Sequence, residues 1–182
     1  MKVITAPEIY NQKENEISVF LAGGITNCDN WQQDIIRYIK RFRPDDMDND
    51  LIIYNPHRDN FPINDPLAAD EQICWEFKNL SKMDIFSMYF CKGESDQPIC
   101  MYELGRYISQ MQIRFPIDWQ KRIIISVEDE YKRKNDVLIQ CELSCGKQIK
   151  VHTQNKFRRI DDLRINHRNL IVNAYRKLKG MF

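Results

Sequence analysis

The chain has 182 residues and a formal net charge of +1, with 43% hydrophobic and 29% charged residues. This length suits one ordinary domain with its own hydrophobic core, and we expect residues 1–182 to form it. The near-neutral charge excludes a strongly basic protein that coats nucleic acid, so nucleic acid is not an expected partner. No apolar run approaches the roughly 20 residues that span a bilayer, and the N-terminus lacks a secretory signal. The sequence therefore predicts a cytoplasmic protein with no membrane partner.

Strand-like and helix-like segments alternate along the first two thirds of the chain. β-branched and aromatic runs predict strands, and apolar residues at helical spacing predict helices. The first strand ends at Gly23 and Gly24, and the second helix should place Ile73, Phe77 and Leu80 on its inner face. Strands are predicted at 17–22, 51–54, 84–90 and 122–127, and helices at about 31–39, 65–83 and 98–111.

After residue 127 the pattern is weaker. Residues 136–141 and 148–151 could be strands, and residues 160–178 have the spacing of an amphipathic helix whose other face is basic and, we expect, solvated. Residues 152–182 are thus predicted to be a basic C-terminal helical extension. The alternation predicts an α/β fold with a parallel sheet of four to five strands and helices on both faces. In such sheets the ligand site lies beyond the carboxyl ends of the strands.

The six cysteines form no C-x-x-C pair, and the chain has only three histidines. Structural zinc sites need ligands at close, repeated spacing. Cys141 and Cys145 are the closest cysteine pair, and no second pair follows them. The pattern therefore predicts no metal site and no cofactor, and it favours free thiols that pack as small hydrophobic side chains.

Three segments carry residue types suited to chemistry. Gly23 and Gly24 would let backbone approach a ligand, although most such pairs only form a turn. Glu76 lies beside the apolar stripe of its helix, where it could be solvated or turned into a cleft. Glu103 lies near the positive end of a helix dipole, although it could be an ordinary surface residue. Gly105 costs that helix roughly 1 kcal/mol relative to alanine, which suggests close packing.

Together these segments resemble the nucleoside 2-deoxyribosyltransferase-like family over roughly residues 3–137. The element Tyr102-Glu103-Leu104-Gly105, at its distance from Trp75-Glu76, is the more specific part of the resemblance. The family implies a flavodoxin-like α/β fold, cleavage of the N-glycosidic bond of a nucleoside with base transfer or hydrolysis, and a homo-oligomer in which a neighbouring subunit completes the site. The supporting elements are Ala6-Pro7-Glu8, Phe20-Leu21-Ala22-Gly23-Gly24-Ile25, Trp31, Tyr54-Asn55-Pro56-His57-Arg58, Gln72 and Asp84.

By this resemblance, Glu103 corresponds to the nucleophile, which forms a covalent glycosyl-glutamate intermediate in a retaining mechanism. Glu76 corresponds to the second acid, which is an aspartate in many relatives, and Asp84 is the reserve. The pair suits the chemistry, because one carboxylate stabilises the positive charge that develops on the sugar while a second acid helps the base to leave. The expected substrate-binding residues are Gly23, Gly24, Ile25, Trp31, Asn55, Arg58 and Trp75. Each tryptophan could either stack on the base or belong to the core.

The expected ligands are a nucleoside or nucleotide and a free base. Relatives that prefer monophosphates carry an arginine in the glycine loop, and residues 23–28 contain none, which favours free nucleosides. A nucleoside 5′-monophosphate N-glycosidase is one alternative, with Arg58, Lys92 or Arg133 at the phosphate. The other is a non-enzymatic nucleotide-binding module, which would not require both Glu76 and Glu103.

Overall fold

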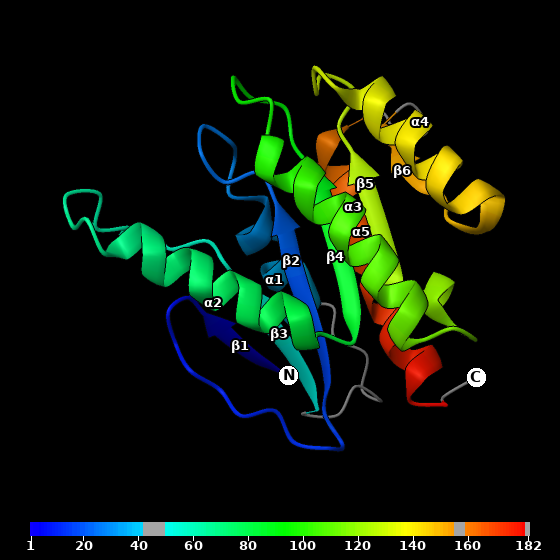
Figure 1. The fold of residues 1–182 in the computed structure, drawn as a ribbon, viewed down its shortest axis with the longest axis horizontal. Coiled ribbons are helices and arrows are strands. Elements are labelled where there is room, and N and C mark those ends of the chain that lie inside the picture. Colours follow the sequence, from blue (N-terminus) through cyan, green and yellow to red (C-terminus); the bar gives the residue numbers. More distant parts are fainter. Residues whose placement is uncertain (42–49, 155–158, 181–182) are drawn as a thin grey trace.

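The computed structural model describes residues 1–41, 50–154 and 159–180. Six parallel strands form one sheet in the order β1-β3-β2-β4-β5-β6 (Figure 1). Five of them, without β1, have the 2-1-3-4-5 order of a flavodoxin-like fold, which confirms the predicted class. The strands are β1 (Lys2–Thr5), β2 (Ile17–Gly23), β3 (Leu51–Asn55), β4 (Ile85–Phe90), β5 (Ile123–Val127) and β6 (Val151–Thr153).

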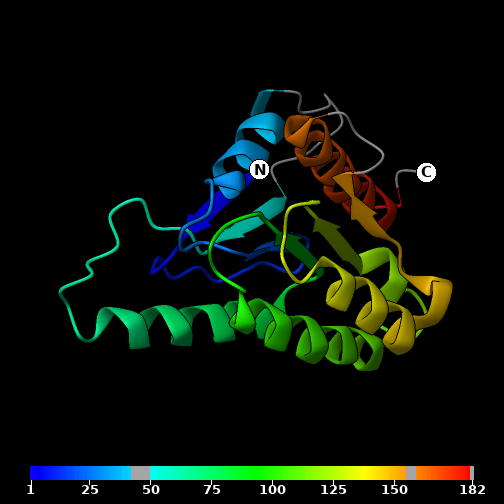
Figure 2. The same cartoon turned by 90° about the horizontal axis from the view of Figure 1, so that it is seen from above.

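In the described part of the chain, five α-helices cover the two faces of the sheet. Helices α1 and α5 lie on one face, and α2, α3 and α4 lie on the other (Figure 2). The order of the strands reverses between β2 and β4, and the loops after these two strands lead to helices on opposite faces. A crevice at such a switch point is where ligands bind in open α/β sheets. The helices are α1 (Trp31–Arg41), α2 (Ala68–Lys82), α3 (Pro98–Arg114), α4 (Lys134–Cys145) and α5 (Ile160–Leu178).

The strand count was underestimated because both additional strands lie at the edges of the sheet. β1 has only four residues, and β6 has three partly exposed ones, so neither shows the continuous apolar run of a central strand. β6 also begins where the predicted strand at 148–151 ends. The strand predicted at 136–141 is wrong, because these residues belong to α4. Val137 and Cys141 are buried there at helical spacing, a pattern that a short apolar run does not distinguish from a strand.

Helix α2 buries a narrower stripe than predicted. Leu80 is buried as expected, whereas Ile73 is 62% exposed and Phe77 is 50% exposed. The stripe instead runs through Trp75, Asn79 and Leu80, whose side chains pack towards the sheet. Gly105 in α3 is also exposed, and a Cβ atom placed there would meet nothing within 4 Å, so the expectation that this glycine packs closely against a strand is wrong.

Helix α5 covers its own sheet. Leu163, Ile171 and Ala174 are buried against β2, β4 and β5, so this stripe needs no second chain to cover it. His167 is fully buried between the hydroxyls of Ser87 and Ser126, at 2.7 Å from each. α5 is therefore an integral layer of the fold, while residues 155–158 and 181–182 of the predicted extension lie outside the described residues.

The basic face of α5 is only partly solvated. Arg164 is 5% exposed and forms ion pairs with Asp34 at 2.6 Å, with Asp29 at 3.0 Å and with Glu128 at 3.4 Å. Glu128 follows β5, is fully buried, and also accepts hydrogen bonds from Tyr89 Oη and the Lys92 backbone amide. A buried arginine with several carboxylate partners fixes the elements that supply them. Here it ties α5 to the start of α1 and to the loop after β5.

Candidate active site

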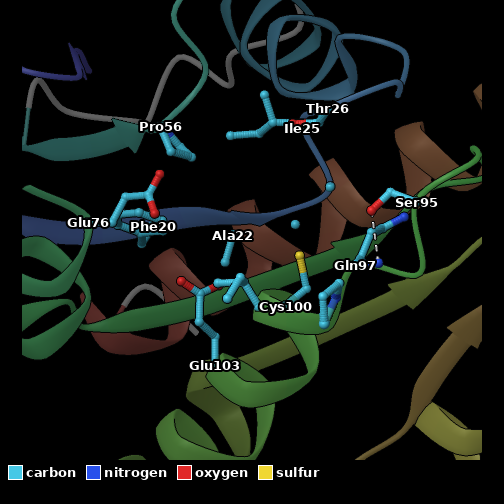
Figure 3. Close-up of a pocket in the computed structure, with 14 residues that line it drawn as sticks. Phe20, Ala22, Ile25, Thr26, Pro56, Glu76, Ser95, Gln97, Cys100 and Glu103 are labelled. Carbon is cyan, nitrogen blue, oxygen red and sulfur yellow. Dashed lines mark hydrogen bonds between the residues drawn. The ribbon is translucent and has the colours of Figure 1, made fainter. Parts of the chain in front are cut away.

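A cavity of about 200 Å³ opens at the carboxyl edge of the sheet, beside the switch point between β2 and β4 (Figure 3). The end of β2 and the turn after it form one side, and the N-terminal half of α3 forms another. Glu76 reaches the cavity from α2. The cavity is lined by Phe20, Ala22, Gly23, Gly24, Ile25, Thr26, Pro56, Glu76, Ser95, Gln97, Pro98, Ile99, Cys100 and Glu103.

Glu76 and Glu103 come from different helices and lie on the same side of this cavity (Figure 3). Glu76 Oε1 accepts a hydrogen bond of 2.6 Å from Gln72 Nε2, one helical turn earlier. The same Gln72 amide donates to Pro56 O at 2.8 Å, which fixes its orientation. The structure thus brings together in one cavity the two acids that the sequence singled out, which lie 27 residues apart in the chain. A hydrogen bond from Gln72 fixes the orientation of one of them, Glu76.

Burial perturbs both carboxyls. It raises the pKa of Glu76 above its ordinary value, against the opposing effect of the hydrogen bond from Gln72. Burial also raises the pKa of Glu103, and the negative charge of Glu76 raises it further, to about 8. Two nearby carboxyls that cannot both ionise easily hold one proton between them near neutral pH. Such a pair contains one ionised and one protonated group, as nucleophilic attack with general acid catalysis requires.

The glycines at the end of β2 are required by close packing. Gly23 has φ of 151°, and a Cβ atom on it would lie 2.1 Å from the backbone oxygen of Tyr89. A Cβ atom on Gly24 would lie 2.7 Å from each of three atoms: Cys28 Sγ, Cys91 Sγ and Gln97 Cδ. A side chain at Gly23 would collide with the backbone, and one at Gly24 would have to displace three packed side-chain atoms. The backbone of these two glycines therefore forms part of the cavity wall.

Gln97 is a cavity residue that the sequence analysis missed. It has a left-handed backbone conformation (φ 50°) directly before Pro98, which opens α3, and it is 4% exposed. Its Nε2 donates to Cys91 O at 2.6 Å, which leaves Oε1 as the free end of the carboxamide, with no partner among the described residues. The proline helix start was visible in the sequence, but a left-handed glutamine gives no pattern by which it could be recognised.

A second cavity of about 350 Å³ adjoins the first and shares Ile25, Thr26, Pro56 and Glu76 with it. Its remaining walls are mostly apolar, and Arg58 is its cationic residue. The Arg58 guanidinium pairs with Glu71 at 3.1 Å and lies 5.4 Å from the centre of the Phe61 ring. The other lining residues are Phe61, Ala69, Gln72 and Ile73.

The structure does not bring Asp84 to the site. It precedes β4, at the opposite edge of the sheet from the cavity, because the cavity lies at the carboxyl ends of the strands. Asp84 Oδ2 accepts hydrogen bonds from Gln12 Nε2, Ser18 N and Ser18 Oγ, at 2.7, 2.8 and 2.9 Å. This carboxylate therefore joins β2 and β4 at their starts, and its position contradicts the expectation that it is a reserve catalytic acid.

Three of the predicted substrate-binding residues support the site from the core instead of lining it. Trp31 is fully buried, stacks on Tyr89 and donates to Gly24 O at 2.9 Å. Trp75 is 6% exposed and donates to Glu8 O at 2.7 Å. Asn55 is buried and accepts from the backbone amide of His57 at 3.1 Å. Gly23, Gly24 and Ile25 line the first cavity, and Arg58 lines the second.

The chain is an α/β protein with a cavity at the carboxyl edge of a parallel sheet. The family model of nucleoside 2-deoxyribosyltransferase-like proteins matches residues 16–119, which include both Glu76 and Glu103. The chain therefore belongs to the nucleoside 2-deoxyribosyltransferase-like family. No curated protein matches the chain. Among the described residues, no helix is both long and apolar enough to cross a membrane.

Proposed function

We propose that this protein cleaves the N-glycosidic bond of a nucleoside through a covalent glycosyl intermediate on Glu103, followed by base transfer or hydrolysis. The observation that carries the proposal is the pair formed by Glu76 and Glu103, which line one cavity and in which the charge of Glu76 raises the pKa of Glu103. A module that only binds nucleotides would not need two buried acids in mutual repulsion, since each costs stability when it ionises.

The proposed reaction has two displacements at the anomeric carbon of the sugar. Burial and the charge of Glu76 favour the shared proton on Glu103, so this proton first passes to Glu76. Ionised Glu103 then attacks this carbon while protonated Glu76 donates a proton or a hydrogen bond to the departing base. The C–N bond breaks, an ester to Glu103 forms, and the neutral base leaves. A second base or a water molecule then attacks the same carbon and breaks the ester, which frees Glu103 as a carboxylate, while Glu76 accepts the proton of the attacking group. Two inversions leave the configuration of the sugar unchanged.

The two adjoining cavities suit the two halves of a nucleoside. The first holds both acids and a backbone wall, so the sugar belongs there, with its anomeric carbon near Glu103. The second has Phe61 and Ile73 as apolar walls and Arg58 and Gln72 as polar groups, which suits a planar base. The ion pair with Glu71 neutralises the positive charge of Arg58, which would otherwise attract a phosphate. Lys92 and Arg133 lie outside both cavities. This arrangement favours free nucleosides over 5′-monophosphates.

A substrate panel tests the proposal directly. The protein is incubated with purine and pyrimidine nucleosides, their 2′-deoxy forms and their 5′-monophosphates, each with and without a second free base. Chromatography then measures the released base and any exchanged nucleoside. We expect base release or exchange with nucleosides and much less with monophosphates. A preference for monophosphates would assign Arg58 to a phosphate and favour the alternative function, and the absence of turnover across the panel would contradict the proposal.

The shared proton predicts a bell-shaped pH profile of kcat/KM. Activity should fall at low pH, where the pair takes up a second proton and neither acid is ionised, and should fall again above about pH 8, where the pair loses its remaining proton. In Glu76→Gln the remaining acid is Glu103, whose pKa should drop because the neighbouring charge is gone. The weak residual activity of this variant should then rise to a plateau with no alkaline fall. An unchanged alkaline limb in Glu76→Gln would assign that limb to another group.

We also propose that the protein is a homo-oligomer, with a second copy covering the exposed sides of α2 and α3 beside the cavities. Ile73, Phe77, Ile99 and Tyr102 expose apolar area there, from 50% to 64% of each side chain. Light scattering at micromolar concentration should show more than one chain per particle, and Phe77→Glu should reduce the mass. Leu143→Glu on α4, which is 77% exposed on a different helix, is the matched control. A monomeric wild type would contradict this part of the proposal.

A further inference from the structure

The loops after β2 and β4 meet through two thiols. Cys28 lies in the turn after β2, and Cys91 directly follows the last residue of β4. Both sulfur atoms lie 2.7 Å from the position that a Cβ atom on Gly24 would occupy, so they share one side of this residue. A side-chain hydrogen bond joins Cys91 to Cys28. The two thiols are thus neighbours in space although 63 residues separate them in the chain.

The thiols contact residues of the cavity without lining it themselves. Cys91 Sγ lies 3.8 Å from Gly24 O, and Gln97 Nε2 lies 3.7 Å from Cys91 Sγ and 3.9 Å from Cys28 Sγ. Gly24 and Gln97 both line the first cavity, whereas Cys28 and Cys91 do not. A change in the bonding of these sulfurs would therefore reach the cavity wall directly.

Cys28 can be reached from the surface through a depression that neither Glu76 nor Glu103 lines. It is partly exposed and lines an open depression together with Asn27, Asp29, Lys92, Gly93, Glu94 and Glu130. The hydrogen bond from Cys91 lowers the pKa of Cys28, while the same bond and burial raise the pKa of Cys91. Cys28 is consequently the thiol that forms a thiolate more readily, and its buried partner is placed to react with it second.

We propose that Cys28 and Cys91 form an oxidisable dithiol that closes to a disulfide and thereby inactivates the adjacent cavity. With hydrogen peroxide, the Cys28 thiolate takes the terminal OH group to give a sulfenic acid, and the displaced hydroxide leaves as water with the thiol proton. Cys91 then attacks the Cys28 sulfur and displaces a second water. The two thiols lose two electrons and two protons, and one peroxide becomes two waters. A small-molecule disulfide gives the same product by two exchange steps.

Closure of the disulfide must deform the wall of the cavity. A disulfide bond is about 2.05 Å long, much shorter than a hydrogen bond between two sulfurs. Its formation draws the turn that contains Cys28 towards the end of β4 and removes the contacts that Gln97 makes with both sulfurs. A misplacement of about 1 Å in a reacting site can cost on the order of 100-fold in rate. We expect oxidation to lower the turnover rate by a factor of this size. This part of the prediction rests on the proposed function.

The test begins with the fully reduced protein, exposed to hydrogen peroxide and then digested with trypsin. The expected product is a disulfide between the peptides 14–37 and 83–92, which contain Cys28 and Cys91. Dithiothreitol should remove the link and restore turnover. Cys28→Ser should form no link and keep its activity in peroxide. Cys74→Ser, which removes an exposed thiol on α2, should behave as the wild type.

Two readouts need no substrate, so they test the dithiol even if the proposed activity fails. One is the peptide link, and the other is hydrogen exchange of residues 23–28, which should change on oxidation of the wild type and not of Cys28→Ser. A protein that forms no Cys28–Cys91 link in peroxide or in oxidised glutathione would overturn the proposal. A quantitative link that leaves both turnover and hydrogen exchange of this turn unchanged would overturn its effect on the cavity.

Discussion

Glu103→Gln should fold normally and lose turnover by roughly 10⁴-fold or more, because an amide cannot attack the sugar carbon or form the glycosyl ester. The substitution keeps the shape of the side chain and removes only the ionisable group. Single-turnover assays with the best nucleoside of the panel would measure the loss. In the wild type, a 2-fluoro nucleoside should leave a sugar on Glu103, which mass spectrometry of the peptide would detect.

The melting curve is the control for this variant. The pKa of Glu103 is raised to about 8 in the folded protein, whereas an unfolded glutamate has a pKa of about 4.3. Between these values the folded state holds a proton that the unfolded state has released, so ionisation destabilises the wild type as the pH rises. Glu103→Gln should therefore melt no lower than the wild type at pH 8. Near-normal turnover by this variant would remove Glu103 from the mechanism.

Glu76→Ala should slow the release of natural bases by about 10²–10⁴-fold, the usual span for general acid catalysis. The effect should depend on the leaving group. Natural purines and pyrimidines leave poorly and need a proton, whereas a nucleoside analogue with an electron-poor base needs little help. The variant-to-wild-type rate ratio in a single turnover should therefore lie much closer to one for the analogue.

Equal rate ratios for both substrates would contradict the acid role of Glu76, and the melting curve then separates the remaining explanations. A lowered melting temperature would indicate that Glu76 stabilises α2, in which it forms a hydrogen bond of 2.6 Å with Gln72 one turn earlier. An unchanged melting temperature would indicate that Glu76 positions the substrate. Gln72→Leu is the matched variant for the second case, because it removes the hydrogen bond and leaves the carboxyl in place.

The sequence predicted those parts of the fold that rest on local periodicity. The buried residues of α1, from Trp31 to Ile39, follow the helical spacing that predicted them, and so do Cys100, Leu104, Ile108 and Met111 in α3. The edge strand β1 was missed, and β6 was predicted three residues too early at 148–151, because a strand with one neighbour is short and partly exposed. α2 was predicted to be more deeply buried at Ile73 and Phe77 than it is, because an apolar residue on a helix does not reveal whether its own sheet or another surface covers it.

Residues of the candidate site that belong to a sequence motif could be predicted, whereas residues that only the fold brings to the cavity could not. Glu76 and Glu103 were found from their motifs, and the structure places both in one cavity. Asp84 was included as a reserve acid because it is one of the residues that carry the family resemblance, although residues at the start of a parallel strand lie opposite the ligand edge. Gln97 was missed because its role depends on a left-handed backbone and on contacts with Cys91. Such contacts between distant segments leave no local pattern.

The residues that match the family model do not include all the elements that support the candidate site. The match covers residues 16–119, which contain β2, β3 and β4, while β1, β5 and β6 lie outside it. Arg164, also outside the match, binds Asp29 in the loop after β2, and His167 fills the space between Ser87 and Ser126. The loop that forms the cavity wall is thus anchored by the last helix. A fragment cut at the family boundaries would keep both glutamates and lose part of the scaffold that supports their cavity.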